Sequence, residues 1–298
     1  MASKTLPTTT LRPFAAAACA ALALLLGACA SNPSTGPGRP RGPEAPYPVV
    51  LAASSERRES ALAGWAALLG DAASASPTPE LLPVTATPAA LPAGLAALPR
   101  LPRVIIDDAA EQSEEETRES LRRFIASAPT LIGSDLRHLS LVEIVDAPGG
   151  AGAKLARYHQ RPFHYPLRGD YGEVTVTFTP DLRVTGLSST AVPDADRLRP
   201  LLRSITRQLT AEQAAAALAG RGSVAYADAS GAQQTRPVAS ASDITPRELV
   251  IFPVRREGQP PALELHYAWE LEVGGAGPTL LVYIDAVNGQ QLAATPRI

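Results

Sequence analysis

Two groups of polar residues have types and spacings that could do chemistry. In the first, His159 and His164 lie five residues apart, and Asp170 follows closely. Imidazole and carboxylate groups can hold zinc, so this set could form a metal site. In a loop between strands, however, the spacing fixes no ligand geometry, and no cysteine lies near. We therefore interpret the two histidines as a polar surface pair and expect no metal ligands here.

The second group is a row of ionisable residues near the C-terminus. Glu264, His266, Glu270 and Glu272 alternate with apolar side chains along residues 263–273. This period of two predicts a strand with one buried and one solvent-exposed face. A row of acids beside a histidine could also serve acid–base catalysis. No nucleophile is evident, so we interpret the row as the wet face of the strand.

Motifs of other catalytic and nucleotide-binding classes are missing from the sequence. The segment 186–190 lacks the second glycine of a nucleophile elbow, and there is no phosphate loop, Rossmann fingerprint or EF-hand loop. The acidic run 107–116 suits the start of a helix. The net charge is 27 − 29 = −2 without a long basic run, unlike a nucleic-acid surface. We therefore expect no enzyme, no catalytic residue, no cofactor and no nucleic-acid partner.

The N-terminal residues have the pattern of an export signal. Lys4 and Arg12 precede an unbroken apolar run of thirteen residues, 14–26. This length suits a signal h-region and is short for a membrane-spanning helix. The two cysteines, Cys19 and Cys29, both lie in the first thirty residues. The body that follows therefore has no disulfide and no cysteine-based zinc site.

The signal ends in Leu26-Gly27-Ala28-Cys29, which resembles the lipobox of bacterial lipoproteins. The resemblance implies that residues 1–29 are a lipoprotein signal peptide and that Cys29 is lipidated, with palmitate among its acyl chains. Each buried CH₂ of such chains contributes about 0.8 kcal/mol of membrane binding. Because Ala30 rather than Asp follows the cysteine, the resemblance implies the outer membrane, facing the periplasm or the surface. The alternative is an ordinary cleaved signal with a chance cysteine.

Residues 30–103 are predicted to be a Pro/Ala-rich tether. They hold thirteen of the 29 prolines, whereas eleven of the fourteen aromatic residues lie from Phe124 onward. Residues 31–48 are expected to be flexible to extended, and the structure of residues 71–103 is left open. Within the tether, residues 54–70 could form a short helix, with Ser54 or its neighbour as N-cap. Trp65 is expected to pack on the body, the alternatives being a partner contact or a membrane-surface contact.

From residue 104 the pattern predicts two successive units, each with helix followed by antiparallel strands. Capping boxes at 113–116 and 210–213 mark a helix start in each unit. Asn288-Gly289 predicts a type I′ turn in the terminal hairpin. The fold class is therefore α+β, with one module at 104–193 and another at 194–298. The expected strands are 139–145, 154–159, 173–178, 182–188, 223–227, 249–252, 263–273 and 280–284, with a further helix at 198–209.

The two modules resemble the FTP and PepSY modules of thermolysin- and fungalysin-type metalloprotease propeptides. The first likeness lies in RRFIASAPTLIGSD and KLARYHQRPFHYPLRGDYGEVTVTF, where Arg157-Tyr158-His159-Gln160 matches the family's RYQQ. The second lies in LHYAWELEV and LLVYIDAVNGQQL, with Trp269, Glu270 and Asp285 at family positions. Arg168 to Gly172 replaces the family's glycine pair, which is a departure.

The resemblance implies a propeptide role rather than a peptidase. The sequence has no His-Glu-x-x-His, and it stops at Ile298, where a protease would continue into its catalytic domain. We expect a body that binds a secreted or envelope metalloprotease as an inhibitor or chaperone, through a sheet edge or a meander loop. The alternative is a structural or interaction lipoprotein of the envelope that has no protease partner.

Overall fold

The computed structural model describes residues 46–105, 113–148, 152–228, 230–238, 240–275 and 277–297. All of them belong to one compact unit, Glu44–Ile298, which contains every hydrophobic core of the described chain. The predicted signal peptide and Cys29 lie outside the described residues, and so does most of the acidic run 107–116.

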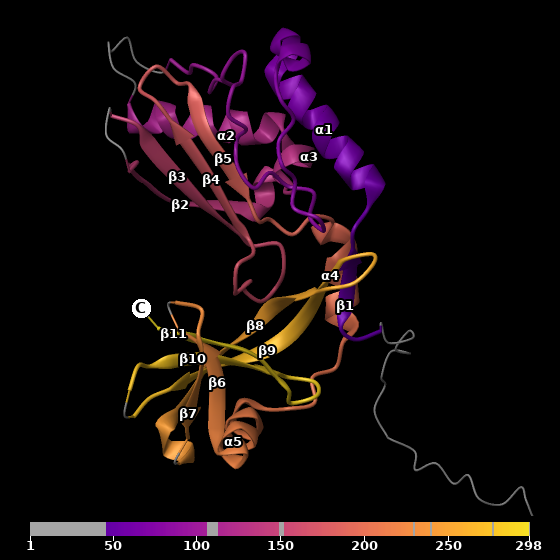
Figure 1. Cartoon of the computed structure of the whole chain (residues 1–298), viewed down its shortest axis with the longest axis vertical. Coiled ribbons are helices and arrows are strands. Elements are labelled where there is room, and N and C mark those ends of the chain that lie inside the picture. Colours follow the sequence, from indigo (N-terminus) through magenta and orange to yellow (C-terminus); the bar gives the residue numbers. More distant parts are fainter. Residues whose placement is uncertain are drawn as a thin grey trace, which may run out of the picture. The chain divides into compact units, whose positions relative to one another are not determined.

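The fold is α+β, with a helix preceding the strands in each half, as predicted. The first half is an antiparallel sheet in the order β2-β3-β4-β5, with α2 and α3 against one face (Figure 1). Val174, Val176 and Phe178 of β4 point into this core, where they meet Phe124 and Ile125 of α2. The strands are β2 (Leu139–Asp146), β3 (Lys154–Gln160), β4 (Glu173–Phe178) and β5 (Val184–Ser189). The helices are α2 (Glu114–Ser127) and α3 (Pro129–Ile132), followed by the 3₁₀ turn η2 (Leu136–His138).

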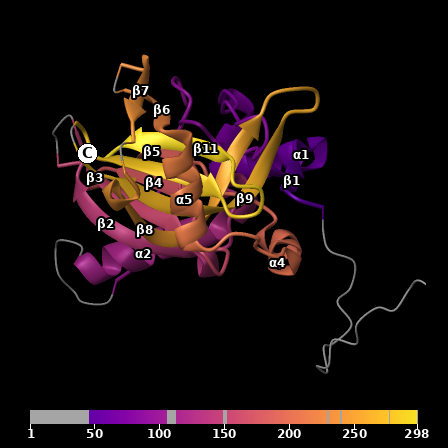
Figure 2. The ribbon, with the colours of Figure 1, turned by 90° about the horizontal axis from the view of Figure 1, so that it is seen from below.

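The second half is an antiparallel sheet centred on the twelve-residue strand β9. One edge of β9 pairs with β8, and the other pairs with β1 and β10 at different heights. Figure 2 shows α5 lying across this sheet, where Ala214 and Leu218 pack on Leu271 and Val273. The strands are β8 (Ile244–Arg256), β9 (Ala262–Val273), β10 (Leu280–Asp285) and β11 (Gln291–Pro296). The other elements are α4 (Ala195–Ser204), α5 (Ala211–Arg221), the hairpin β6 (Ser223–Ala227) and β7 (Gln233–Pro237), and the 3₁₀ turn η3 (Ala241–Asp243).

Both predicted capping boxes are present. The Ser113 side chain accepts a hydrogen bond from the Glu116 backbone N–H, and the Glu116 side chain accepts one from the Ser113 backbone N–H. Thr210 and Gln213 form the same pair of bonds at the start of α5. These bonds satisfy N–H groups that the helix start leaves without partners. The helix predicted at 198–209 is instead α4, which begins at Ala195 and ends at Ser204.

The tether prediction is wrong for residues 46–103, which are packed on the two sheets. Val49–Ala52 forms β1, which pairs antiparallel with β9, and Leu51 is fully buried. Further along, the carbonyls of Pro88 and Pro99 accept hydrogen bonds from the backbone of β5. Proline has no N–H to give to a sheet but keeps its carbonyl, so proline-rich sequence can line a strand edge. Composition alone therefore misassigned a segment that closes one sheet edge.

The predicted helix within that segment is confirmed. It is α1 (Ser55–Leu69), followed by the 3₁₀ turn η1 (Gly70–Ala75). The Ser54 side chain caps it by accepting a hydrogen bond from Arg57 N. Trp65 is 3% exposed within the core of the first sheet, as predicted, and its indole N–H donates to Pro77 O at 3.3 Å.

The terminal turn differs from the predicted type I′ geometry. A type I′ turn needs positive φ at both central residues, but only Gly289 has one, at 75°. Asp285 organises the loop instead, because its Oδ1 accepts from Val287 N at 2.7 Å and from Asn288 N at 3.0 Å. Asn288-Gly289 correctly predicted that the chain reverses here, but the buried Asp285 determines the geometry of the turn.

Candidate functional site

The strand β2 has a free side, and we call it the β2 edge. β2 is the end strand of its sheet and pairs only with β3 among the described residues. The pairing is irregular between Leu141 and Glu143, which leaves Val142 without a cross-strand partner. Val142 is 52% exposed and Val145 is 39% exposed. The β2 edge therefore offers unpaired backbone groups beside apolar side chains.

The opposite edge of the same sheet is closed. β5 receives the segment that precedes α2: Val184 N donates to Pro99 O at 2.8 Å, and Ser189 N donates to Pro88 O at 2.9 Å. An isolated bridge joins Arg100 to Arg183. As far as the described residues go, only the β2 side of this sheet is open to strand addition.

Two acidic residues on β2 are paired with basic residues, so they do not prevent strand addition at the β2 edge in the way that unpaired charges would. Natural proteins often protect edge strands with charged side chains. Here Glu143 Oε1 lies 2.9 Å from Arg157 Nη1, and Asp146 Oδ1 lies 2.6 Å from Lys154 Nζ. Both partners belong to β3, so the two carboxylates are directed toward the sheet and their charge is compensated there.

The predicted wet face of β9 is wrong for its central residues. His266 is 6% exposed, Glu270 is 4% exposed and Ala268 is fully buried. Phe252 and Tyr283 stack over this face with ring centroids 4.4 Å apart. The alternation correctly predicted that the two faces of β9 differ in polarity. The prediction that the polar face is exposed to solvent is wrong for the centre of the strand, because other parts of the chain cover both faces there.

His266 belongs to a buried polar cluster at the end of β10. Its Nδ1 lies 2.7 Å from Asp285 Oδ2, and the Tyr47 hydroxyl donates to the same oxygen at 2.8 Å. The His266 Nε2 lies 3.5 Å from Glu264 Oε2 and has no hydrogen bond. Burial alone would raise the pKa of Asp285, but the hydrogen bonds from His266, the loop backbone and Tyr47 outweigh it and lower that pKa.

The pairing of an aspartate with a histidine resembles part of a catalytic triad, but a nucleophile is not in place. Among the described residues, no hydroxyl bonds to His266 Nε2. Burial and the neighbouring Asp285 carboxylate also raise the pKa of Tyr47, which keeps its hydroxyl a donor. The cluster is therefore a structural clamp. It ties Tyr47, at the start of the described chain, to the C-terminal hairpin.

Glu270 forms the second buried cluster on this face. Its carboxylate contacts Arg168 Nε at 3.2 Å and Arg247 Nε at 3.3 Å, and it accepts a hydrogen bond from the Tyr283 hydroxyl at 3.2 Å. Arg168 comes from the loop between β3 and β4 and also pairs with Glu248. The loop is therefore joined to the second sheet by compensated charges.

The first group of histidines lines a cavity of about 810 Å³ formed largely by the β3–β4 loop. His159 lies 4.0 Å from Glu173, and His164 meets the Tyr165 ring edge-on at 4.7 Å. Asp170 lines the same cavity. Within the described ranges, no three histidine, cysteine, aspartate or glutamate side chains are grouped to hold a metal ion.

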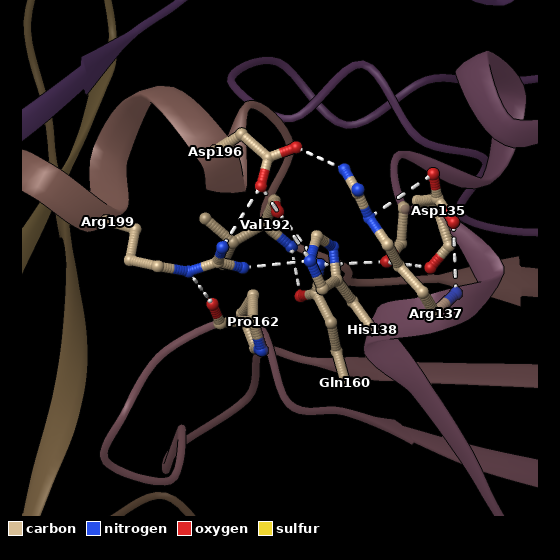
Figure 3. Close-up of polar contacts among 9 residues, drawn as sticks. Asp135, Arg137, His138, Gln160, Pro162, Val192, Asp196 and Arg199 are labelled. Atoms are coloured by element: carbon tan, nitrogen blue, oxygen red, sulfur yellow. Dashed lines mark hydrogen bonds and ion pairs between the residues drawn. The ribbon is translucent and has the colours of Figure 1, made fainter.

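A junction that the sequence did not reveal surrounds His138 (Figure 3). Arg199 Nη2 donates to His138 Nε2 at 2.8 Å, and Arg199 Nε donates to Pro162 O at 2.9 Å. A guanidinium has no acceptor, so His138 must be neutral at Nε2 to accept this bond. The Asp196 carboxylate lies 3.2 Å from the Arg199 guanidinium and also pairs with Arg137. The junction joins α4 to the start of β2 and to the segment that follows β3.

We predict that His138 makes stability depend on pH. Burial and the adjacent Arg199 guanidinium lower the pKa of His138 from its ordinary value of 6.5, against the opposing effect of Asp196. The unfolded chain therefore takes up a proton at higher pH than the folded chain, and stability falls as pH drops below about 6.5. Thermal unfolding at several pH values should show a smaller decrease for His138→Gln than for the wild type.

Only weak local signals in the sequence point to these clusters. Asp285 follows the apolar run of β10 directly, and a lone carboxylate at the end of a buried strand is a candidate loop cap. His138 and Arg199 had no comparable signal. They lie 61 residues apart and come together only through tertiary packing.

Comparison with known proteins adds little about function. No protein-family model matches the chain, and no curated protein matches it. Among solved structures, the chain is similar to the Bacillus megaterium YpeB C-terminal domain. The TM-score is 0.29 at 11% identity, covering 64% of this chain and 70% of that chain. None of the helices in the described ranges is long and apolar enough to cross a membrane.

Proposed function

We propose that this protein is a lipid-anchored protein of the bacterial cell envelope, whose body binds an extended segment of another protein at the β2 edge. The observation that carries the proposal is the open β2 edge of the first sheet, with exposed Val142 and Val145. Strand addition uses the backbone groups of such an edge for affinity and its side chains for selection. No catalytic activity is proposed.

The leading partner is a secreted or envelope metalloprotease, which the protein would inhibit or help to fold. This choice rests on the resemblance of residues 104–298 to the FTP and PepSY modules of metalloprotease propeptides. Shared fold alone does not establish shared function. The β2 edge lies in the FTP-like part, so the likeness and the open edge support the same half of the body.

The membrane anchor in this proposal is Cys29, which would be lipidated and would become the new N-terminus once the residues before it are cleaved off. Its support is the lipobox-like sequence Leu26-Gly27-Ala28-Cys29 behind an apolar h-region. Several acyl chains on one cysteine would hold the protein at the membrane far more firmly than one chain. The proposed location is the outer membrane, facing the periplasm or the surface. Metabolic labelling with a palmitate analogue, compared between wild type and Cys29→Ser, tests this part directly.

Lysines on the β2 edge are expected to weaken partner binding. In the variant Val142→Lys/Val145→Lys, two charges would have to be buried against the added strand. We expect at least about a tenfold loss of affinity, which corresponds to roughly 1.4 kcal/mol. A photo-crosslinking residue at position 142 in native envelopes would first identify the partner, and titration of the purified partner would then measure affinity.

The matched control is Gln233→Lys/Thr235→Lys, which adds the same charge on two exposed positions of β7. It should bind as the wild type does. Unchanged partner binding by the β2 variant would contradict the role of this edge, provided that both variants melt like the wild type.

The alternative is an envelope lipoprotein with a structural or interaction role and no protease partner. The same open edge favours it equally, because strand addition does not specify the class of partner. A protease in the crosslinked product, with activity reduced by the purified body, supports the leading proposal. A non-protease product, together with normal secreted proteolysis after gene deletion, supports the alternative.

A further inference from the structure

A basic and aromatic surface lies at the C-terminal end of α4, and we call it the α4 patch. It consists of Leu201, Arg203 and Arg207 together with Phe163 and Tyr165 of the β3–β4 loop. Arg207 Nη1 donates to the Tyr165 hydroxyl at 3.0 Å, and its guanidinium lies 5.7 Å from the centre of that ring. These contacts join the segment that follows α4 to the β3–β4 loop at Tyr165.

The charge of the α4 patch stands out against the rest of the body. From residue 46 onward the chain has 23 basic and 28 acidic residues, a net charge of 23 − 28 = −5. Four arginines nevertheless fall in residues 197–207, which contain no acid. Arg197 and Arg199 pair with the aspartates at the start of α4. Arg203 makes no ion pair among the described residues and is exposed, as is Arg207.

The side chains around these arginines suit a boundary between water and lipid. Leu201 is 36% exposed between the basic positions. Phe163 and Tyr165 are half-buried, with apolar ring bodies at the surface. Arginine and tyrosine place an apolar stem or ring in the membrane interface while keeping the polar end in water. An apolar residue flanked by arginines on a helix end is typical of surfaces that bind anionic lipids.

The α4 patch lies in the part of the body that includes β1, the first described strand after the proposed anchor in the sequence. Leu198 and Leu202 of α4 pack in the same core as Val49 and Leu51 of β1. Cys29 and the start of the described chain at residue 46 are 46 − 29 = 17 residue steps apart in the sequence. Fully extended, they span at most roughly 60 Å. The anchor would therefore hold the body within this distance of the bilayer.

We infer that the α4 patch docks on the anionic headgroups of the membrane that carries the lipid anchor. The patch rests on the proposed function only for this proximity, since its affinity for anionic lipid is a property of the body itself. Docking would hold the negatively charged body against the membrane by its basic side and give it a fixed orientation there.

The test uses the fragment 44–298, which contains all the cores of the described chain and lacks the signal and Cys29. Its binding is measured by co-sedimentation with phosphatidylcholine vesicles, with and without added phosphatidylglycerol. We expect binding only with phosphatidylglycerol and a decrease as salt is raised, because screening weakens exposed charge pairs. Neutralising Arg203→Gln/Arg207→Gln should weaken it about 25-fold, at roughly fivefold for each arginine.

The matched control is Arg100→Gln/Arg103→Gln, which removes two exposed arginines beside β5. It should bind vesicles like the wild type. Leu201→Asp provides a second variant at an exposed position and should also reduce binding. Equal binding by wild type and the Arg203/Arg207 variant, or no binding to phosphatidylglycerol vesicles, would overturn the inference.

Failure of this inference can be distinguished from failure of the proposed function. The vesicle assay contains neither Cys29 nor a protein partner, so it reads only the α4 patch. If the patch variant binds vesicles normally but loses a crosslinked protein in native envelopes, the patch is a protein interface and the lipid inference is wrong. Loss of palmitate labelling in Cys29→Ser tests the anchor alone.

Discussion

Asp285→Ala is expected to lower the free energy of unfolding by about 3–5 kcal/mol, the range for breaking a buried charged pair by removing one partner. The Asp285 side chain is fully buried and accepts hydrogen bonds from four groups. Without it, the Tyr47 hydroxyl, His266 Nδ1 and two loop N–H groups would lose their acceptor. This is a large share of the 5–15 kcal/mol typical of a folded domain. Urea unfolding followed by tryptophan fluorescence measures it.

Two further variants separate the charge of Asp285 from its hydrogen bonds. Tyr47→Phe removes one donor and should cost about 1–2 kcal/mol, because the carboxylate keeps its other partners. Asp285→Asn keeps the shape of the acceptor for the loop and should cost less than alanine. If alanine and asparagine are both within about 0.5 kcal/mol of the wild type, the range for neutral surface changes, the cluster does not hold the hairpin.

The same residue predicts sensitivity to acid. The pKa of Asp285 in the folded protein lies below its ordinary value of 3.8. The unfolded chain therefore binds a proton first as pH falls, and the stability contributed by Asp285 is lost below about 3.8. Asp285→Asn should reduce this part of the acid dependence. The His138 effect appears at higher pH, so the two residues can be separated in one titration.

Leu51→Ala is expected to lower the free energy of unfolding by about 2–5 kcal/mol, the range for truncating a buried leucine. Leu51 is fully buried in a core formed by β1, α4 and β9, with Leu198 and Leu263 among its members. Shortening the side chain leaves a cavity that the surrounding sheet can fill only in part. Equilibrium unfolding in urea provides the measurement.

The neighbouring residue gives a matched control. Val50 is 42% exposed on the opposite side of the same strand, so Val50→Ala should change stability by less than about 0.5 kcal/mol. A small effect of Leu51→Ala, similar to that of Val50→Ala, would mean that β1 is not part of the body. The original expectation of a tether up to residue 103 would then regain support.

The sequence by itself determined the elements whose signals are local. The capping boxes at Ser113 and Thr210 predicted helix starts correctly, because a cap is formed within four residues of chain. Alternation along residues 173–178 predicted β4 for the same reason, since a strand exposes every second side chain to one face. The α+β class followed from the order of these elements.

Tertiary structure decided which faces and edges were covered. His266 and Glu270 lie on the polar side of an alternating strand, but Phe252, Tyr283 and the Arg168 loop bury them. Burial depends on residues distant in the chain, and alternation carries no information about them. The proline-rich segment 88–101 was misassigned because its contribution is carbonyl groups at a sheet edge, which composition does not reveal.

For the β2 edge, too, the strand could be predicted from the sequence, but its open side could not. Sequence predicted the strand at 139–145, and only the sheet order showed that β2 has a neighbour on one side while β5 has neighbours on both. The lipobox-like motif at Cys29 is the opposite case. It is defined by local sequence that an enzyme would read in an extended chain, so the sequence alone carries that prediction, and the packing of residues 46–297 decides where partners can bind.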